Sequence, residues 1–366
     1  MSKKHYIIPI FVAQEGCPHN CVFCNQNAIT GTNYEDVNGK FTKDTIEEYL
    51  KTINKENSIV EVSFYGGTFT GINIQKQKEL LTVAKEYKDK GKIDFIHLST
   101  RPDYIDDDIL RNLKDYSVDV IELGVQSLDK EVLLKSGRGH SEKDTETASR
   151  LIKLYGFVLG HQIMLGLPGD NFKKDIETVI KSIAMKPDIY RIYPSLVIKN
   201  TPMELMYNNS TYNPYDLYEA VNITKVIYCM LKTKNINVIR IGLQPTEEIN
   251  VGKEIVAGPF HPAFRELVEG SIFNDMILEN IIKNLNDCNT MITIKINQKD
   301  LSKLYAHKKK FFCDMKKQLK TLNVQVIQDN SIERGNLILL YKENYKKLSI
   351  NEYMIRKSKE GNLSNL

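Results

Sequence analysis

The sequence lacks most of the features that assign a protein quickly to a class. None of its apolar runs approaches the roughly 18 residues that span a bilayer, and its first residues, MSKKH, lead into a strand-like run without the cleavage pattern of a signal peptide. The sequence also contains no Ser-His-Asp, P-loop or GxGxxG pattern. We therefore expect a soluble, cytoplasmic protein with no membrane partner.

Cysteine is scarce, and half of it is scattered along the chain. Of the six cysteines, Cys229, Cys288 and Cys313 stand alone in apolar or helical contexts. Isolated cysteines of this kind are typical of small core residues in a reducing compartment. A disulfide framework is therefore not expected.

The net charge is small but unevenly distributed. The formal net charge is +4 at pH 7, with about +7 on residues 271–366 and about −3 on the remainder. Such an asymmetry indicates either a tail that faces a polyanion or a solvated lysine-rich surface, and the sequence leaves both open.

What the sequence does have is a regular alternation of apolar runs and amphipathic segments. The predicted strands are 5–12, 59–65, 95–100, 120–125, 157–165, 189–197 and 237–242, and the predicted helices are 42–54, 74–89, 106–115, 143–155, 171–184 and 215–233. Strands separated by helices of this length pair in parallel through right-handed crossovers. The pattern alone leaves open a partial six-unit barrel, a full eight-unit barrel and a doubly wound sheet.

The other three cysteines lie close together near the start of the chain. Cys17, Cys21 and Cys24 have the spacing C-x3-C-x2-C, whereas paired zinc sites and ferredoxin runs use further Cys or His ligands. Three thiolates on one short loop suit a [4Fe-4S] cluster whose fourth iron stays open to an external ligand, and Phe23 would help to keep water away from it. A structural zinc site or a chance grouping is the alternative.

Small and polar residues follow the predicted strands, where a barrel presents its ligand site. Gly66-Gly67-Thr68 ends the second strand, and glycines there let the backbone approach a ligand closely. Ser99, Gln126 and Gln162 are polar candidates on later strands. His161 is predicted to face the opposite side of its strand from Gln162 and so to be structural.

Arg138 follows the fourth strand after one short predicted helix. A guanidinium group can donate two parallel hydrogen bonds to a carboxylate, which makes Arg138 a candidate ligand-binding residue. The alternative is a surface ion pair with Glu142 or Asp144.

Together these motifs resemble the radical S-adenosylmethionine (SAM) superfamily and, over about residues 5–270, the core of the Elp3-type proteins. The resemblance is carried by the cysteine motif and by four blocks: Ser99–Tyr104, Glu122–Ser127, Arg138–His140 and Ile189–Thr201. It implies an α/β fold with a partial (β/α)6 TIM-type barrel. It also implies a [4Fe-4S] cluster in which SAM chelates the iron that no cysteine holds.

The resemblance also implies how SAM is held. The loop Gly66-Gly67-Thr68 would bind the SAM amino group, although many relatives have Glu where Thr68 stands; relatives of oxygen-independent coproporphyrinogen oxidase also have Thr. Arg138 would bind the methionine moiety, and Ser99, Gln126 and Gln162 would line the rest of the SAM site. No residue is singled out as a catalytic acid or base.

The chain departs from the Elp3 pattern after the core. Only about 100 residues follow Leu267, too few for the acetyltransferase domain of the complete relatives. The sequence resembles a truncated bacterial branch of the Elp3-like proteins. It does not indicate which reaction that branch catalyses. We expect a radical SAM core barrel over 1–250, a connecting extension over 251–288 and a small basic α+β domain over 289–366.

The expected C-terminal domain has a strand at 291–296, a long basic helix around 299–321, and strands at 324–327 and 336–341. Residues 300–310 resemble the KH-domain segment that carries a GxxG phosphate clamp, but Ala306 and Lys309 replace the two glycines. A plain packing domain and a degenerate KH-like RNA module both remain open.

The resemblance implies that a low-potential donor of the flavodoxin or ferredoxin type reduces the cluster, and that SAM is cleaved to a 5′-deoxyadenosyl radical. Three substrate hypotheses follow. The radical acts on RNA, with tRNA as the leading candidate; it acts on a small molecule or tetrapyrrole; or the chain is a non-catalytic carrier of a cluster or haem.

Overall fold

The computed structural model describes residues 4–12, 17, 19–25, 37–243, 253–282, 291–319 and 323–359. The chain divides into two compact units. The N-terminal unit comprises residues 1–215 and 244–259, and the C-terminal unit comprises residues 216–243 and 260–366. The domain boundaries expected at residues 250 and 288 stay a prediction.

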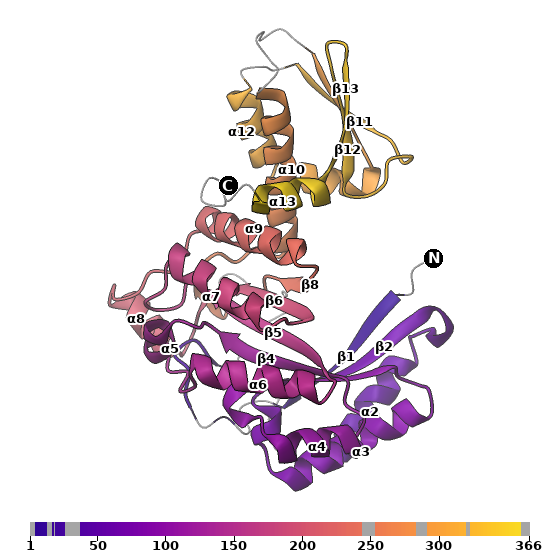
Figure 1. The fold of residues 1–366 in the computed structure, drawn as a ribbon, viewed down its shortest axis with the longest axis vertical. Coiled ribbons are helices and arrows are strands. Elements are labelled where there is room, and N and C mark those ends of the chain that lie inside the picture. The colour runs from indigo at the N-terminus through magenta and orange to yellow at the C-terminus, as the bar shows by residue number, and fades with distance from the viewer. Residues whose placement is uncertain are drawn as a thin grey trace. The chain divides into compact units, whose positions relative to one another are not determined.

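The N-terminal unit is built on six parallel strands that are neighbours in chain order. They are β1 (Lys4–Val12), β2 (Ser58–Gly66), β3 (Phe95–Thr100), β4 (Val120–Gln126), β5 (Val158–Leu165) and β6 (Ile189–Pro194). The helices between them are α2 (Gly39–Leu50), α3 (Ile74–Asp89), α4 (Asp107–Asp115), α5 (Lys130–Lys135), α6 (Glu142–Leu154) and α7 (Phe172–Ala184). The curled half-barrel (Figure 1) confirms the predicted α/β fold class.

The two faces of β1 differ in burial. On β1, Ile8 and Ile10 are completely buried, whereas Ile7 on the opposite face exposes 39% of its surface. Side chains alternate between faces along a strand, so Ile8 and Ile10 face the helices and Ile7 faces the concave interior. This alternation places the chemistry of the barrel on one face of each strand.

The helices begin where the sequence supplies a capping side chain. The side chains of Asn38, Asp106 and Asn171 each accept a hydrogen bond from a backbone N–H of the first turn. At α6, Ser141 and Asp144 form a reciprocal capping box. These caps satisfy donors that a helix leaves unpaired.

The strand register brings the cysteine loop and the glycine pair to one edge. In the parallel pairing of β1 with β2, Val12 lies opposite Gly66, and the Gly67 N–H donates to the Val12 carbonyl at 2.8 Å. Both following loops therefore leave from the C-terminal edge of the sheet, where barrels present their ligand sites.

Further short elements complete the N-terminal unit. Helix α8 (Pro202–Asn208) follows β6, and β7 (Val197–Ile198) pairs antiparallel with β9 (Ile255–Ala257). Helix α5 is the short helix predicted before Arg138. The sequence analysis missed α8 and this small ribbon, whose segments of two to seven residues show too little periodicity to predict.

The C-terminal unit contains helices and a separate sheet. Helix α9 (Leu217–Thr233), strand β8 (Asn237–Ile241) and helix α10 (Phe264–Ile282) precede a four-stranded sheet with the order β11-β10-β12-β13. Its strands are β10 (Ile292–Ile296), β11 (Val324–Gln328), β12 (Asn336–Tyr341) and β13 (Asn344–Ser349), and α13 (Ile350–Lys359) follows. This unit supplies the expected small α+β architecture.

The predicted long basic helix over 299–321 is wrong. Helix α11 (Leu301–Leu304) and helix α12 (Lys310–Gln318) are separate, because His307, Lys308 and Lys309 all adopt left-handed backbone conformations, with φ of 55°, 53° and 68°. Left-handed residues cannot continue a right-handed helix. Helical periodicity on both sides of the turn concealed the break.

The isolated cysteines differ in burial. Cys229 is buried, as expected of a core residue, but Cys313 on α12 is exposed and the prediction for it is wrong. Cys288 lies outside the described residues. No helix among the described residues is long and apolar enough to cross a membrane.

Candidate functional site

The cysteine motif lies on a loop that its neighbours hold at several points. The Val22 N–H donates to the Ser136 carbonyl at 3.1 Å, and the Val22 carbonyl accepts from the Met203 N–H at 2.9 Å. Within the motif, the Cys24 N–H donates to the Cys21 carbonyl at 3.0 Å. The loop is thus tied to the C-terminal end of α5 and to the first turn of α8.

Phe23 and Val22 pack against a small apolar cluster. The cluster consists of Val197, Met203 and Tyr212, of which Val197 and Met203 are completely buried. Phe23 therefore has an anchoring role in the loop that the sequence did not reveal. Its predicted role in keeping water from a cluster stays a prediction.

Two of the cysteine sulfurs contact predicted SAM-site residues. The Cys17 sulfur lies 3.2 Å from the Thr68 hydroxyl, and Nη1 of Arg138 donates to the Cys21 sulfur at 3.4 Å. The fold thus brings the cysteine motif, the loop after β2 and Arg138 together.

Arg138 is buried, with 6% of its surface exposed, so the alternative of a surface ion pair is not what the structure shows. Its Nη2 donates to the Gly124 carbonyl at 2.6 Å, and a Cβ on Gly124 would lie 3.4 Å from that nitrogen. Gly124 therefore leaves room for the guanidinium group. Among the described residues, Nε of Arg138 is buried without a hydrogen-bond partner.

His140 is a second buried group with unsatisfied polar atoms. The residue is 5% exposed, and the Val125 backbone lies near its ring, yet neither ring nitrogen makes a hydrogen bond within the described part of the chain. Burial, followed by the charges of Arg138 and Arg101, lowers the pKa of His140 from 6.5 to about 3. The ring is therefore neutral at physiological pH.

The loop after β2 exposes its backbone at the same edge. Gly66 has a φ of +110°, which a residue with a side chain rarely adopts, while Thr68 is completely buried. Next along the loop, the Thr70 hydroxyl lies 2.6 Å from the Thr100 hydroxyl at the end of β3. The loop is thereby fixed to the neighbouring strand end.

The remaining predicted SAM-site residues lie on the interior face of the sheet. Nε2 of Gln162 donates to Oε1 of Gln126 at 3.4 Å, and the Ser99 hydroxyl donates to Oε1 of Glu122 at 3.4 Å. Gln126 has a left-handed φ of 61°, at an irregularity in the pairing of β4 with β5. Gln126 and Gln162 thus lie together, and Ser99 lies beside Glu122; the contact of all three with SAM stays a prediction.

His161 faces the helices, as its alternation with Gln162 indicates. It is completely buried, and its two ring nitrogens lie 2.9 Å from the Ser149 hydroxyl of α6 and 2.7 Å from the Ser182 hydroxyl of α7. Both partners belong to the helical layer.

The sequence analysis missed a line of charged groups along the concave interior. Nδ1 of His97 lies 2.8 Å from Oε1 of Glu61, and its Nε2 lies 3.7 Å from Oε2 of Glu122. Nε of Arg191 donates to Oε2 of Glu122 at 2.6 Å. Glu61 is 6% exposed and Glu122 2%.

These contacts control the protonation of the interior groups. Burial opposes the ionisation of Glu61, but His97, Ser63 and His5 outweigh it and lower the pKa of Glu61 from 4.5 to about 2. Burial raises the pKa of Tyr65 to about 12, and the Tyr65 hydroxyl accepts from Nη2 of Arg191 at 2.7 Å. Strand alternation was the signal that could have found these residues, because Glu61 and Tyr65 share a face of β2.

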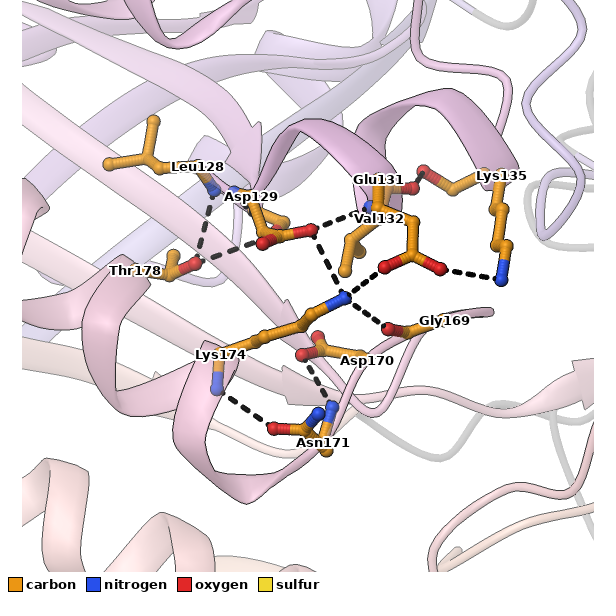
Figure 2. A network of polar contacts seen from close by, with 12 residues as sticks. Leu128, Asp129, Glu131, Val132, Lys135, Gly169, Asp170, Asn171, Lys174 and Thr178 are labelled. Carbon is orange, nitrogen blue, oxygen red and sulfur yellow. Dashed lines mark hydrogen bonds and ion pairs between the residues drawn. The ribbon is translucent and has the colours of Figure 1, made fainter.

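The loop after β5 is held by a second polar network, shown in Figure 2. Nζ of Lys174 on α7 donates to the Gly169 carbonyl at 2.9 Å, and lies 2.6 Å from Oε2 of Glu131 and 3.4 Å from Oδ1 of Asp129. Glu131 also pairs with Lys135 at 2.7 Å. Lysine 174 thus ties the loop after β5 to the start of α5.

The donor chemistry of the site fits a [4Fe-4S] cluster and SAM. Three thiols on one loop are the soft donors that iron–sulfur clusters take, and the unsatisfied Nε of Arg138 and ring nitrogens of His140 are polar groups that a charged cofactor can satisfy. Among the described residues, no three metal-binding side chains already converge on one point. Ligation by Cys17, Cys21 and Cys24 therefore stays a prediction.

Curated relatives match the core of this chain. A tRNA uridine(34) acetyltransferase of Methanocaldococcus jannaschii is 28% identical over 256 residues, which cover 59% of this chain and 47% of that protein. The human Elongator complex protein 3 is 25% identical over 261 residues, covering 59% of this chain and 48% of that protein. The chain spans about half the length of the curated relatives it matches.

A solved structure shares the fold. The archaeal Methanocaldococcus infernus Elp3 with an N-terminal deletion superimposes with a TM-score of 0.59 at 21% identity, covering 77% of this chain and 64% of that one. Two family models also match: the radical SAM superfamily over residues 11–183 and the radical SAM C-terminal domain over residues 187–273. The chain therefore belongs to the radical SAM superfamily, with an Elp3-like core, and its cofactors are a [4Fe-4S] cluster and SAM.

Proposed function

We propose that this protein is a cytoplasmic radical SAM enzyme that cleaves SAM reductively and uses the resulting radical to modify a tRNA. The observation that carries the proposal is the convergence of three segments at one sheet edge: the cysteine loop, the loop after β2 and the buried Arg138. Direct contacts link them, from Cys17 to Thr68 and from Cys21 to Arg138.

Cys17, Cys21 and Cys24 would hold the cluster, and Gly66, Gly67, Thr68 and Arg138 would hold the methionine end of SAM. Together, the bound cluster and SAM would supply one-electron reductive cleavage of SAM and hydrogen-atom abstraction from the substrate. The chain's own contribution is positioning and exclusion of water.

Specific residues serve these two tasks. The buried Arg138 offers a positive charge beside Cys21, and its contact with the Gly124 carbonyl holds the guanidinium group in place. Phe23 is held by the apolar cluster behind it, which keeps the cysteine loop in a fixed position. Gln126 and Gln162 present amide groups on the interior face.

The choice of tRNA rests on the relatives. Proteins named tRNA uridine(34) acetyltransferase match this chain over its core. The chain spans about half the length of these relatives, so the acetyltransferase activity in their name is not part of the proposal. A flavodoxin- or ferredoxin-type protein is the proposed electron donor.

The first test is SAM cleavage. Anaerobically reconstituted protein reduced with dithionite should release 5′-deoxyadenosine, and the Arg138→Ala variant should bind SAM more weakly by about 1.5–3 kcal/mol, the usual worth of a hydrogen bond to a charged group. The exposed Arg111→Ala variant is the matched control. Release of S-adenosylhomocysteine alone would rule out the radical mechanism.

The second test concerns the substrate. Nucleosides of bulk tRNA from cells with and without the gene are compared by mass spectrometry, with the small-molecule fraction measured in parallel. A modified nucleoside that disappears with the gene supports the proposal. An altered metabolite with unchanged tRNA would contradict it.

A further inference from the structure

The C-terminal unit carries a group of aromatic rings around the turn that breaks the predicted helix. Four rings interlock: Tyr218 at the start of α9, His261 before α10, His307 in the turn and Phe311 in α12. The His307 ring lies 5.7 Å from Tyr218, 6.1 Å from His261 and 5.9 Å from Phe311, measured between ring centroids. All four residues are half-buried, so each keeps part of its surface open to solvent.

Three consecutive lysines lie between His307 and Phe311 in the sequence. Lys308, Lys309 and Lys310 are all exposed. Nζ of Lys310 lies 3.9 Å from the centroid of the Tyr218 ring, and Nζ of Lys309 lies 4.7 Å from that of Tyr305. The ammonium groups are therefore held beside aromatic faces instead of extending freely.

The local charge is strongly positive. Residues 299–319 contain seven lysines and two aspartates. One of the lysines, Lys303, forms ion pairs with Glu269 and Asp300, in which its Nζ lies 2.8 and 3.1 Å from their carboxylate oxygens. Lys308 and Lys309 in the turn and Lys310 at the start of α12 are exposed.

We propose that Tyr218, His261, His307 and Phe311, together with Lys308–Lys310, form a surface that binds single-stranded RNA. We call it the aromatic–lysine surface. Unpaired bases have flat faces that stack on aromatic rings, and the phosphates between them are met by lysines. Paired bases in a duplex do not offer these faces, so the surface selects an unpaired loop or end.

Two other kinds of partner fit less well. A membrane surface would call for large exposed aliphatic side chains, and residues 299–319 have none. An acidic protein segment would form ion pairs with the lysines but would make no specific contact with the aromatic rings. The combination of rings and lysines therefore favours RNA.

The surface lies on a different part of the chain from the cysteine site, and residues 305–311 lie beyond both matched family models, which end at residues 183 and 273. The choice of RNA over DNA rests on the proposed function. The experiment below separates a failure of the surface from a failure of that function.

The experiment measures binding of the full-length, cluster-loaded protein to a fluorescent single-stranded RNA by anisotropy across a salt series. Replacing Lys308, Lys309 and Lys310 with Gln should flatten the plot of log affinity against log salt by about two units, because each phosphate contact on a single strand contributes about 0.7. The Phe311→Leu variant keeps an apolar side chain but loses the flat ring, so it should bind roughly 5- to 100-fold more weakly.

A matched control removes the same charge elsewhere in the C-terminal unit. Lys342, Lys346 and Lys347 are exposed lysines at β12–β13, and replacing them with Gln should leave the slope unchanged. SAM cleavage without RNA should be the same in all variants. If both triple variants lose slope equally, or if Phe311→Leu binds as wild type does, the proposed surface is wrong.

Three further outcomes would overturn the inference without touching the proposed radical chemistry. One is absence of RNA binding by a protein that cleaves SAM normally. Another is equal affinity for the single strand and its duplex. The third is equal competition by polyglutamate of the same charge, which would show that the surface responds to negative charge alone. Tighter binding of single-stranded DNA than of RNA would remove the link to the proposed function.

Discussion

The concave interior of the half-barrel and the aromatic–lysine surface both concentrate charged groups, but they do so under opposite conditions. In the interior, Glu61, Glu122 and Arg191 are at most 8% exposed and bonded to one another or to His97. On the aromatic–lysine surface, Lys308–Lys310 are exposed, and Lys309 and Lys310 lie beside rings.

The difference between the regions shows whether a charged side chain affects folding or binding. A buried charge must be matched within the protein, so changing its partner leaves it uncompensated and weakens folding. An exposed lysine is already solvated, so its removal changes binding to a polyanion and barely affects folding. The same type of substitution should therefore affect different properties in the two regions.

The largest expected effect is at the cysteine loop. Replacing Cys17, Cys21 or Cys24 singly with Ala should reduce the iron and sulfide content of reconstituted protein from a full cluster to near zero, because no other thiol is predicted to replace the missing ligand. Chemical analysis of iron and acid-labile sulfide measures this. The exposed Cys313→Ala variant should load normally; full loading of a triple Cys variant would exclude the assignment.

The next effect is on folding, through the buried pair of Glu122 and Arg191. The Glu122→Gln variant leaves Arg191 with an uncompensated charge and should lower the free energy of unfolding by about 3–5 kcal/mol. Urea titration followed by circular dichroism measures the loss.

The matched control is Glu146→Gln. Glu146 lies 3.4 Å from Lys143 on the surface of α6, and both side chains are largely exposed. Its removal should cost less than about 1 kcal/mol. Equal losses in Glu122→Gln and Glu146→Gln would mean that burial does not determine how much these ion pairs contribute to the free energy of unfolding.

A smaller effect comes from pH through His161. Burial lowers the pKa of His161 from 6.5 to about 3 in the folded protein, so between these values only the unfolded chain takes up the proton. The contribution of His161 is complete above pH 6.5 and is lost as the pH falls toward 3. Between pH 7.5 and 5, wild type should lose about 2 kcal/mol more stability than His161→Asn.

Urea titrations of both proteins at the two pH values test this difference. The comparison between the proteins cancels the other titrating groups, among them Asp170, whose pKa is raised to about 6 by burial and which acts in the opposite direction. Parallel pH profiles for wild type and His161→Asn would show that His161 does not titrate as its burial indicates.

The smallest effect on folding is expected at the aromatic–lysine surface. Replacing Lys308, Lys309 and Lys310 together with Gln should change the free energy of unfolding by no more than about 1 kcal/mol, since exposed cation–ring contacts contribute about 0.5–1 kcal/mol each and mutual repulsion is relieved. A loss as large as that of Glu122→Gln would place these lysines among the structural residues and remove the contrast between the regions.

Much of the N-terminal unit was predictable from the sequence alone. Alternating apolar and amphipathic periods predicted six strands and five intervening helices within a few residues, because strand and helix periods are local properties of the chain. The spacing of Cys17, Cys21 and Cys24 predicted the cofactor class, since a short loop limits which metal group three thiols can hold. The break at residues 307–309 escaped prediction because no glycine or proline marks it.

Only the tertiary structure decided which distant residues meet. Parallel pairing places Val12 beside Gly66, and the fold carries Arg138 to the sulfur of Cys21, 117 residues away in sequence. The contacts of Glu61, His97, Glu122 and Arg191 come from four different strands. A sequence pattern shows which face of a strand a side chain occupies, but the curvature of the sheet determines which faces come within bonding distance.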